Sequence, residues 1–445
     1  MQRRRFLKYS SLTATGLVFA ACNSGDSGKN SKSNSEESQK VPDFGTLEKT
    51  DITIGTIPVT DCAPLVIAKE KGFFTRYGIN VNLSKQLDWQ AVQDGLIAGK
   101  FDASQALFGM PMLAKLGAAK VDMVSLMVLN LNGGGITLSQ KAWDEGIRAG
   151  MEYLNFPEFG DAYRKYLKGL AQKAKLAVDF SVSMNNYNYR YWLAAMGINP
   201  NKDVELIELP PSQMVHKIKA GVMDGYCVSE PWNQQAIAEN TGFTSYITPT
   251  IWQGHPGNVL ATMASWVKEN PTTARALVAA VLEACQFCDR TENRAEVAQI
   301  LAQSKYLNTD AKPVASSLDG TYNYGGFDKK NRVKSVPDFY LFHFRDTNYL
   351  KPPNHVNYPW RSHGVWLLTQ MIRWNHINIQ EYPKDADKII DQIFPLEIYT
   401  DVAQALKIKL PSDRMKVEPA EVFIDGRKFD PSQPVEYLNS FDIKA

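Results

Sequence analysis

Residues 51–81 have the sequence DITIGTIPVTDCAPLVIAKEKGFFTRYGINV, and this stretch decides the fold class. Asp51–Pro58 alternates apolar and polar residues, as a half-buried strand does. Ala63–Gly72 places apolar residues at helical spacing and stops at a glycine, and Asn80–Ser84 is again typical of a strand. A strand, a helix and a strand in this order predict an α/β fold with a parallel sheet.

The same order of elements recurs farther along the chain. Strands are expected at Lys175–Asp179, Val204–Leu209 and Asp224–Val228, and helices at Asn188–Met196 and Ser212–Gly221. Ser212 is a natural N-cap for the second of these helices. The two blocks, near residues 51–110 and 175–232, predict two α/β lobes of similar build.

Three further elements are expected. Trp89–Ala98 is predicted to be a helix, and Pro271–Arg290 a long amphipathic helix with a proline near its start. Val422–Phe429 is predicted to be a β-hairpin, with Asp425-Gly426 as a type I′ turn. The C-terminal third is richer in aromatic residues and in loops.

The composition is that of a soluble globular protein, with 44% hydrophobic and 22% charged residues in a chain of 445. Lys and Arg number 49 and Asp and Glu 47, so net charge does not favour nucleic acid or an anionic membrane as a partner. Five cysteines are too few for a disulfide scaffold. Beyond a short segment near the start, no stretch approaches the roughly 18 apolar residues of a membrane span.

Residues 1–22 have the features of an export signal. Arg3–Arg5 precede Phe6–Lys8, as in a twin-arginine leader, and Ser11–Ala21 is a short, mildly apolar segment. Small residues directly before Cys22 predict a lipoprotein signal, in which this cysteine is lipidated and becomes the mature N-terminus. Phe19 stands where such signals usually carry leucine, so ordinary cleavage beside an incidental cysteine is the alternative.

The segment after the signal has no large apolar residue from Asn23 to Lys40 and is predicted to be a flexible tether, with residues 23–50 as the whole linker. The mature protein is therefore expected to work outside the cytoplasm, held at a membrane. Chemistry that depends on ATP, NAD or nucleic acid is not expected there. The sequence also lacks a phosphate-binding G-x-x-x-x-G-K-[ST] and a dinucleotide-binding G-x-G-x-x-G motif.

Residue types that carry catalysis do not form a recognisable set. No H-E-x-x-H or G-x-S-x-G motif is present, and His355 and His363 lack metal-ligand spacing. Cys285 and Cys288 lie on one face of a predicted helix that no strand precedes, so buried thiols are favoured over a redox pair or a bridge. No cofactor and no metal site are predicted.

Five stretches resemble the nitrate/sulfonate/bicarbonate-binding proteins of the NMT1/THI5-like family, and they narrow the resemblance to the cyanobacterial nitrate- and bicarbonate-binding lipoproteins. They follow one another from residue 63 nearly to the end of the chain, as APLVIAKEKGFFTRYGINV (Ala63–Val81), RYWLAAMG (Arg190–Gly197), GYCVSEPW (Gly225–Trp232), YPWRSHGVWLLTQMIRW (Tyr358–Trp374) and VFIDGRKFDP (Val422–Pro431).

The resemblance implies a two-lobed periplasmic-binding-protein-like fold of type II, in which each lobe is a mostly parallel sheet flanked by helices and the ligand lies in the cleft between lobes. The implied domains are residues 51–135 for the first part of lobe 1, 136–240 for lobe 2, and 241–445 for the return to lobe 1 with an aromatic-rich extension. It also implies a monomer on the periplasmic face of the inner membrane that delivers a small molecule or ion to the permease of an ABC importer.

The resemblance also supplies candidate ligand-binding residues. Trp89 matches a tryptophan that packs on the ligand in the relatives, and Ser229 and Glu230 fall where they carry Gly-Glu. Asn132 falls where nitrate binders carry glutamine, and Asn185, with Asn188 close by, where they carry histidine. Asn258 falls where the nitrate branch has lysine and the bicarbonate branch an acidic residue that helps to hold a metal. A core role for Trp89, turn roles for the asparagines and a helix-terminal role for Glu230 are the alternatives.

These differences share one direction, because a lysine and a chargeable histidine are both replaced by asparagine. A bare anion would lose a charge-assisted hydrogen bond of about 1.5–3 kcal/mol, or about tenfold to a hundredfold in affinity. Nitrate or nitrite stays the first expectation from the family, since backbone N–H groups also hold anions. Bicarbonate, cyanate and a small neutral molecule remain open.

Two other functions compete with the transport role. A periplasmic sensor that presents its bound form to a membrane receptor would have nearly the same sequence, and neighbouring permease genes would distinguish the two. An enzyme is the third hypothesis, because the wider THI5-like superfamily includes pyrimidine synthesis. The export signal and the lack of a paired acid–base or nucleophile set argue against it.

Overall fold

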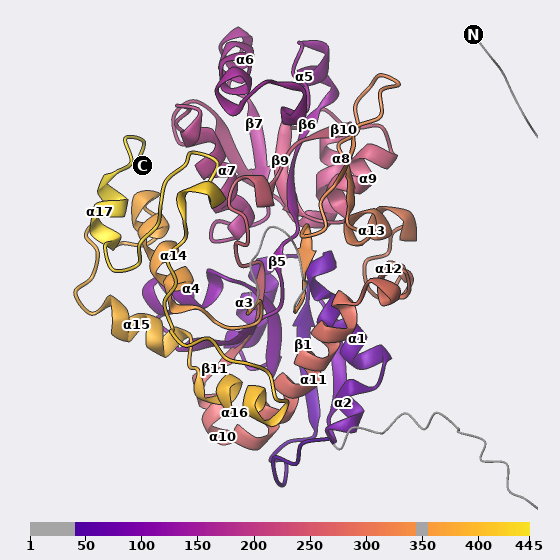
Figure 1. The fold of residues 1–445 in the computed structure, drawn as a ribbon, viewed down its shortest axis with the longest axis vertical. Coiled ribbons are helices and arrows are strands. Elements are labelled where there is room, and N and C mark those ends of the chain that lie inside the picture. The colour runs from indigo at the N-terminus through magenta and orange to yellow at the C-terminus, as the bar shows by residue number, and fades with distance from the viewer. Residues whose placement is uncertain (1–40, 344–354) are drawn as a thin grey trace, which may run out of the picture. The chain divides into compact units, whose positions relative to one another are not determined.

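Two five-stranded sheets, one in each of two lobes, organise residues 41–343 and 355–445, which are the part of the chain that this computed structural model describes (Figure 1). The first sheet has the order β2 (Asn80–Lys85), β1 (Asp51–Thr56), β3 (Ala103–Leu107), β11 (Asn258–Met263), β4 (Met123–Val128). The second has the order β10 (Gly242–Ile247), β6 (Gly134–Ser139), β9 (Gly225–Ser229), β7 (Lys175–Val178), β8 (Glu205–Glu208). In Figure 1 the first lobe lies below the second.

Both sheets are parallel on one side and antiparallel on the other. In the first, β1 pairs in parallel with β2 and β3, and β11 runs antiparallel to β3 and β4. In the second, β7 pairs in parallel with β8 and β9, and β6 runs antiparallel to β9 and β10. The predicted α/β fold with two similar lobes is confirmed, but the sheets are mixed and not mostly parallel as predicted, because β11 and β6 each run antiparallel to both neighbours. β1 and β7 are corresponding strands. This correspondence matters for the site, because ligands bind at the carboxyl ends of such strands.

Helices cover the faces of both sheets. Those of the first lobe are α1 (Ala63–Glu70), α2 (Phe73–Arg76), α3 (Trp89–Ile97), α4 (Met110–Leu116), α10 (Ala264–Glu269) and α11 (Pro271–Asp289), followed by α12 (Arg294–Ala302) and α13 (Ala311–Leu318). Those of the second are α5 (Gln140–Asp144), α6 (Phe156–Gly169), α7 (Met184–Ala195), α8 (Met214–Lys219) and α9 (Trp232–Ala238). The helices predicted at Trp89 and Pro271 are present with nearly the predicted bounds.

Two helix starts differ from the prediction. Helix α7 begins at Met184, before the predicted Asn188, because the Ser183 hydroxyl accepts a hydrogen bond from the backbone N–H of Asn186 and caps the helix earlier. Ser212 is not an N-cap. It lies within a 3-10 turn that begins at Pro211, and α8 starts only at Met214.

The predicted hairpin over Val422–Phe429 is wrong. The segment holds a 3-10 turn, Ala420–Val422, and an isolated bridge between Glu418 and Phe429. Gly426 has a positive φ but Asp425 does not, whereas a type I′ turn needs both. The Asp425 carboxylate instead accepts from the backbone N–H and the guanidinium of Arg427, which bends the chain locally.

The chain crosses between lobes through short paired segments. β5 (Leu131–Asn132) pairs with β14 (Tyr340–Leu341), just before the chain enters the second sheet at β6. The expected boundary at residue 240 falls before β10, but β10 itself pairs with β6 in the second sheet. The return to the first lobe therefore follows β10.

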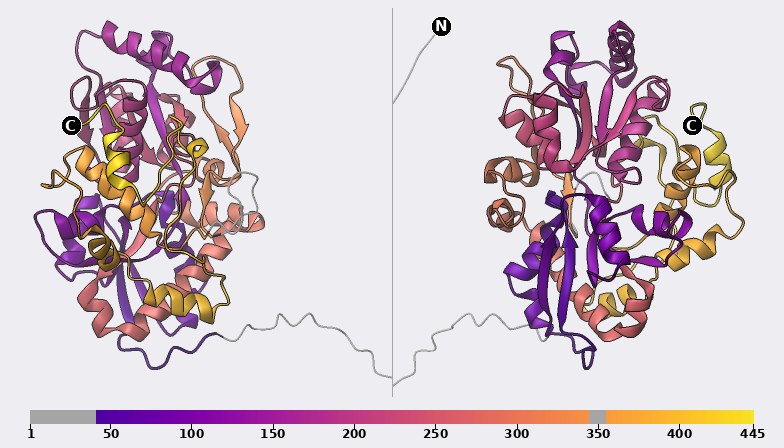
Figure 2. Two further views of the ribbon diagram at one scale, coloured as in Figure 1. Left: turned by 60° about the vertical axis from the view of Figure 1, so that its left-hand side comes forward. Right: turned by 180° about the vertical axis from the view of Figure 1, so that it is seen from behind.

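The C-terminal extension packs along one side of both lobes (Figure 2). Its helices are α14 (Arg361–Arg373), α15 (Ala386–Ile393), α16 (Glu397–Ala405) and α17 (Pro434–Asn439). On α14, the His363 ring lies 6.2 Å from Phe108 of the first lobe, and the Trp366 ring lies 6.4 Å from Tyr191 of the second. One helix thus joins the two lobes outside the sheets.

Two findings bear on compartment and chemistry. No helix in the described ranges combines the length and apolarity that crossing a bilayer requires. Cys285 and Cys288 are free and buried, and burial holds the pKa of both thiols far above the usual value, as predicted for inert core cysteines. Cys22 lies outside the described residues.

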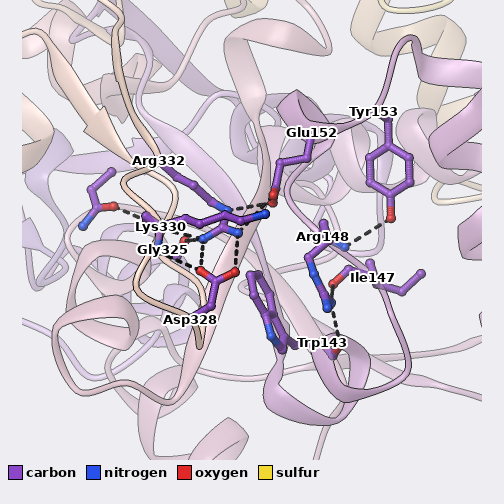
Figure 3. Close-up of polar contacts among 10 residues, drawn as sticks. Trp143, Ile147, Arg148, Glu152, Tyr153, Gly325, Asp328, Lys330 and Arg332 are labelled. Carbon is purple, nitrogen blue, oxygen red and sulfur yellow. Dashed lines mark hydrogen bonds and ion pairs between the residues drawn. The ribbon is translucent and has the colours of Figure 1, made fainter.

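A buried arginine ties the hairpin of β12 (Thr321–Asn323) and β13 (Val333–Ser335) to the second lobe (Figure 3). The Arg332 guanidinium donates to both Glu152 oxygens, at 2.7 and 3.0 Å, and to both Asp328 oxygens, at 2.6 and 3.0 Å. It also lies 4.8 Å from the Trp143 ring. Hydrogen bonds to Arg332 hold the pKa of Asp328 well below its usual range.

Replacing this arginine is expected to destabilise the protein. Arg332→Met keeps most of the side-chain volume but leaves Glu152 and Asp328 without their cation. We expect the free energy of unfolding to fall by about 2–3 kcal/mol. This is less than for a fully buried ion pair, because both carboxylates reach solvent. Urea unfolding of the mature chain measures it. The matched control is Arg414→Met at an exposed arginine, expected within about 0.5 kcal/mol of wild type. Equal stability of the two variants would contradict the anchoring role.

Candidate functional site

An aspartate lies just beyond the carboxyl end of each corresponding strand. Asp61 lies in the 3-10 turn Thr60–Cys62, which follows β1 and precedes α1. Asp179 directly follows β7. Asp61 has no exposed surface and Asp179 is 5% exposed. Carboxylates this deeply buried call for an explanation, because the protein interior disfavours their ionised form.

Asp61 accepts hydrogen bonds from three side chains. Its Oδ1 accepts from the amides of Asn130, at 3.0 Å, and Asn258, at 3.2 Å, and its Oδ2 accepts from the Tyr340 hydroxyl at 2.8 Å. Burial raises the pKa of Asp61 to about 6, although hydrogen bonds from Tyr340, Asn130 and Ser229 oppose the shift. Burial and these hydrogen bonds therefore act in opposite directions on the charge of this carboxyl.

Asp179 connects the second lobe to the first. Its Oδ2 accepts from the indole N–H of Trp89, the first residue of α3, at 3.2 Å and from the Asn185 amide at 3.2 Å. Its Oδ1 is buried and has no hydrogen-bond partner within the described part of the chain. Burial raises the pKa of Asp179 to about 6 as well.

A serine and an amide link the two carboxylates. The Asn185 amide that binds Asp179 also donates to the Ser229 hydroxyl at 3.3 Å, and Ser229 lies near enough to Asp61 to lower the pKa of that carboxyl. Both carboxylates therefore belong to one group of side chains, which we call the interlobe polar cluster: Asp61, Trp89, Asp179, Asn185, Ser229 and Asn258.

The cluster carries negative charge without a compensating cation. Among the ion pairs of residues 41–343 and 355–445, none involves Asp61 or Asp179. Groups that lower their pKa are neutral hydroxyl, amide, indole and backbone donors. The described residues thus supply hydrogen bonds to these carboxylates, and none of them forms an ion pair with either.

Four of the predicted site residues meet in this cluster. Trp89 and Asn258 come from the first lobe, and Asn185 and Ser229 from the second. Asn258 binds Asp61 through its amide nitrogen and accepts from the Gln105 amide at 2.9 Å through its oxygen.

The other three predicted residues have different surroundings. The Asn132 side chain bonds only to backbone groups. Its oxygen accepts from the Gly254 N–H and its nitrogen donates to the Asp338 carbonyl, both at 2.8 Å. Asn132 therefore stabilises the crossover between the lobes. Glu230 accepts from Tyr322 at 2.7 Å and from Gln234 N–H at 3.0 Å, next to the start of α9. Asn188 is buried one turn after Asn185 and makes no described contact with the cluster.

Sequence reasoning missed the two aspartates, together with Asn130 and Tyr340. A usable signal was present for the aspartates, because each comes just after a strand predicted to be parallel, at the edge where α/β folds bind ligands. Asn130 and Tyr340 gave no such signal, since only the crossover pairing of β5 with β14 brings Tyr340 to Asp61.

Comparison with known proteins places this architecture among binding proteins. Residues 45–302 match the NMT1-like family. The nitrate/nitrite binding protein NrtA of Nostoc is 34% identical over 408 residues, covering 89% of this chain and 87% of that protein. The crystal structure of the periplasmic nitrate-binding protein NrtA from Synechocystis PCC 6803 superposes with a TM-score of 0.80 at 32% identity, covering 90% of this chain and 100% of that one.

A longer relative is similar over part of its length. The nitrate import ATP-binding protein NrtC of Synechocystis is 36% identical over 402 residues, which cover 89% of this chain and 56% of that protein. The chain thus spans about half the length of this relative.

Proposed function

Because the chain belongs to the NMT1-like family, we propose that it is the extracytoplasmic solute-binding component of an ABC importer. The observation that carries the proposal is the interlobe polar cluster, in which buried polar side chains of both lobes meet around unneutralised carboxylates. Groups from two lobes can hold one small solute only when the lobes come together, and closure is the signal that such proteins give to a permease. The role involves no covalent chemistry.

Membership of the family does not determine which solute the protein binds. Names of the relatives make nitrate and nitrite the first ligands to test, with bicarbonate, cyanate and a small neutral molecule as alternatives. The side chains of the cluster are acceptors and amides, and its charge comes from Asp61 and Asp179. This balance disfavours a bare anion, which would meet two buried carboxylates.

The importer role has a direct test. The first step is to look for permease and ATPase genes beside this gene. Proteoliposomes that hold the encoded subunits should hydrolyse ATP faster when the mature chain is added. Stimulation supports the importer role. If the mature chain neither binds these subunits nor changes ATP hydrolysis, the role is contradicted, and the alternative of a periplasmic sensor gains support.

The membrane anchor is the second part of the proposal. Twin-arginine export followed by lipidation of Cys22 would hold the mature chain, as a monomer, at the periplasmic face of the inner membrane, with residues 23–50 as the tether. Two acyl chains give stable anchoring, whereas one gives only marginal binding.

Cys22→Ser is expected to release the protein into the soluble periplasmic fraction. The wild type should be labelled by a fatty-acid probe and stay with membranes. Cys62→Ser, at a buried cysteine directly before α1, is the matched control and should keep both the label and the membrane fraction. A Cys22→Ser protein that remains in the membrane fraction would show that something other than a lipid on this residue anchors it.

A further inference from the structure

The interlobe polar cluster also indicates the charge of the solute. We propose that the ligand is a small cation with several N–H donors, held between Asp61 of the first lobe and Asp179 of the second, with guanidinium as the simplest member of its class. The inference rests on the proposed solute-binding function and narrows it to one chemical class.

Charge is the first argument. Asp61 and Asp179 are both buried, and two side chains, Ser229 and Asn185, lie between them. Neither carboxylate takes part in an ion pair among the described residues. Glu230 is a third buried carboxyl close by, since its backbone carbonyl accepts from the N–H of Thr60 beside Asp61, and burial raises its pKa to about 7. Taking such charges out of water is costly unless they are paired, and a bound cation would pair them.

Unused acceptors are the second argument. The Asp179 Oδ1 atom and the Thr60 hydroxyl are both buried, and neither makes a hydrogen bond of ordinary geometry among the described residues; the Ser183 hydroxyl lies near enough to Asp179 to lower the pKa of that carboxyl. Thr60 adjoins Asp61, and its backbone N–H donates to the Glu230 carbonyl across the lobe interface at 2.7 Å. Buried polar atoms are nearly always paired in native proteins, so these atoms point to donors that a ligand brings.

The third argument concerns shape. Planar N–H groups match a carboxylate in pairs, and a flat cation is also attracted to the face of an indole ring. Trp89 offers such a ring beside Asp179, to which its own N–H is bonded. A bare metal ion fits less well, because the described residues contain no group of three or more His, Cys, Asp or Glu that could hold one.

Three planar probes of similar size and different charge test the proposal: guanidinium, urea and nitrate. Calorimetric titration of the mature chain, at millimolar ligand and matched ionic strength, should show guanidinium binding at least a hundredfold more tightly than urea and no binding of nitrate. Tighter binding of urea would overturn the charge assignment in favour of a neutral ligand. Binding of nitrate alone would overturn it in favour of an anion, and binding of none would also overturn it.

Variants assign the binding to these carboxylates. Asp61→Asn and Asp179→Asn keep the shape and remove one charge, so each should weaken guanidinium tenfold to a hundredfold. The control is Asp88→Asn, the same change one residue before Trp89, where asparagine caps α3 as well as aspartate does, and affinity should be unchanged. Unchanged affinity in both cluster variants would contradict the proposal.

Folding of the variants is checked independently. Burial raises the pKa of both aspartates, so their charge costs stability as pH rises through about 6, and the asparagine variants should unfold at the same temperature as wild type or higher at neutral pH. The experiments also distinguish failure of the cation assignment from failure of the importer role. If the protein stimulates the permease but does not bind guanidinium, only the cation assignment is overturned.

Discussion

Replacing Asn258 by lysine is expected to abolish guanidinium binding and to create binding of nitrate. Asn258 lies at the start of β11, 4% exposed, and its amide nitrogen is 3.2 Å from Asp61 Oδ1. A lysine there would neutralise Asp61 from within the protein and place a second positive charge against any bound cation. Loss of one carboxylate partner and gain of a repulsive charge should together exceed a hundredfold in affinity.

The resemblance described above makes this variant realistic, because it implies a lysine at the corresponding position of nitrate binders. We therefore expect the side chain to fit at the start of this strand. Calorimetric titration with guanidinium and with nitrate measures both sides of the exchange.

A neutral variant separates charge from size. Asn258→Met fills a similar length without charge and removes the amide contacts to Asp61 and Gln105. It should weaken guanidinium binding without creating nitrate binding. If the lysine and methionine variants behave alike, charge at this position does not select the ligand, and the cation assignment loses its main support.

The variant Gly109→Ala should bind guanidinium about tenfold to a hundredfold more weakly than wild type while folding as stably. Gly109 precedes α4 in the first lobe, and a Cβ atom at this position would come within 2.4 Å of the Val182 carbonyl oxygen in the second lobe. Its φ of −83° and ψ of −11° suit alanine, so the local backbone is not strained. The clash exists only while the lobes are together, so alanine should oppose closure and leave each lobe intact.

Two measurements distinguish this effect from general damage. Thermal unfolding without ligand should match wild type, and small-angle scattering should show less compaction when guanidinium is added. Gly169→Ala is the matched control, because a Cβ atom there meets nothing within 4 Å, and helix propensity favours alanine over glycine. Wild-type affinity in Gly109→Ala would show that the lobes need not approach this closely around the ligand.

The charge of the interlobe polar cluster also suggests how ligand specificity can change between members of the family. One asparagine amide, that of Asn258, lies against Asp61 at the place where the resemblance puts lysine in nitrate binders. A single substitution to lysine at this buried position would thus neutralise one of the two carboxylates that the lobes present to a ligand. Specificity by charge is a difference of affinities, and it is strongest where water is excluded.

Local patterns were enough for the fold and the class of protein. Hydrophobic alternation in Asp51–Pro58 and helical spacing in Ala63–Gly72 depend on neighbours in sequence, so they were visible in the sequence and were confirmed as β1 and α1. The hairpin predicted at Val422–Phe429 failed because the Asp425 side chain competes for the turn, bonding the backbone of Arg427, and local pattern does not contain that competition.

The proposed binding site was only half visible in the sequence. Trp89, Asn185, Ser229 and Asn258 were named from motifs, and the structure brings them together. Asn132 was named in the same way, but its amide is used by the backbone around residues 254 and 338, which only the folded chain brings near.

The sequence by itself determined two α/β lobes and membership of a solute-binding family, because strand and helix periodicity and continuous motifs are properties of short segments. Tertiary structure alone decided which charges meet. Asp61 and Asp179 come from different lobes, and they share the cluster only because the two sheets face each other across Ser229 and Asn185. Whether a carboxylate is neutralised depends on distances through space, and these determine what the site can bind.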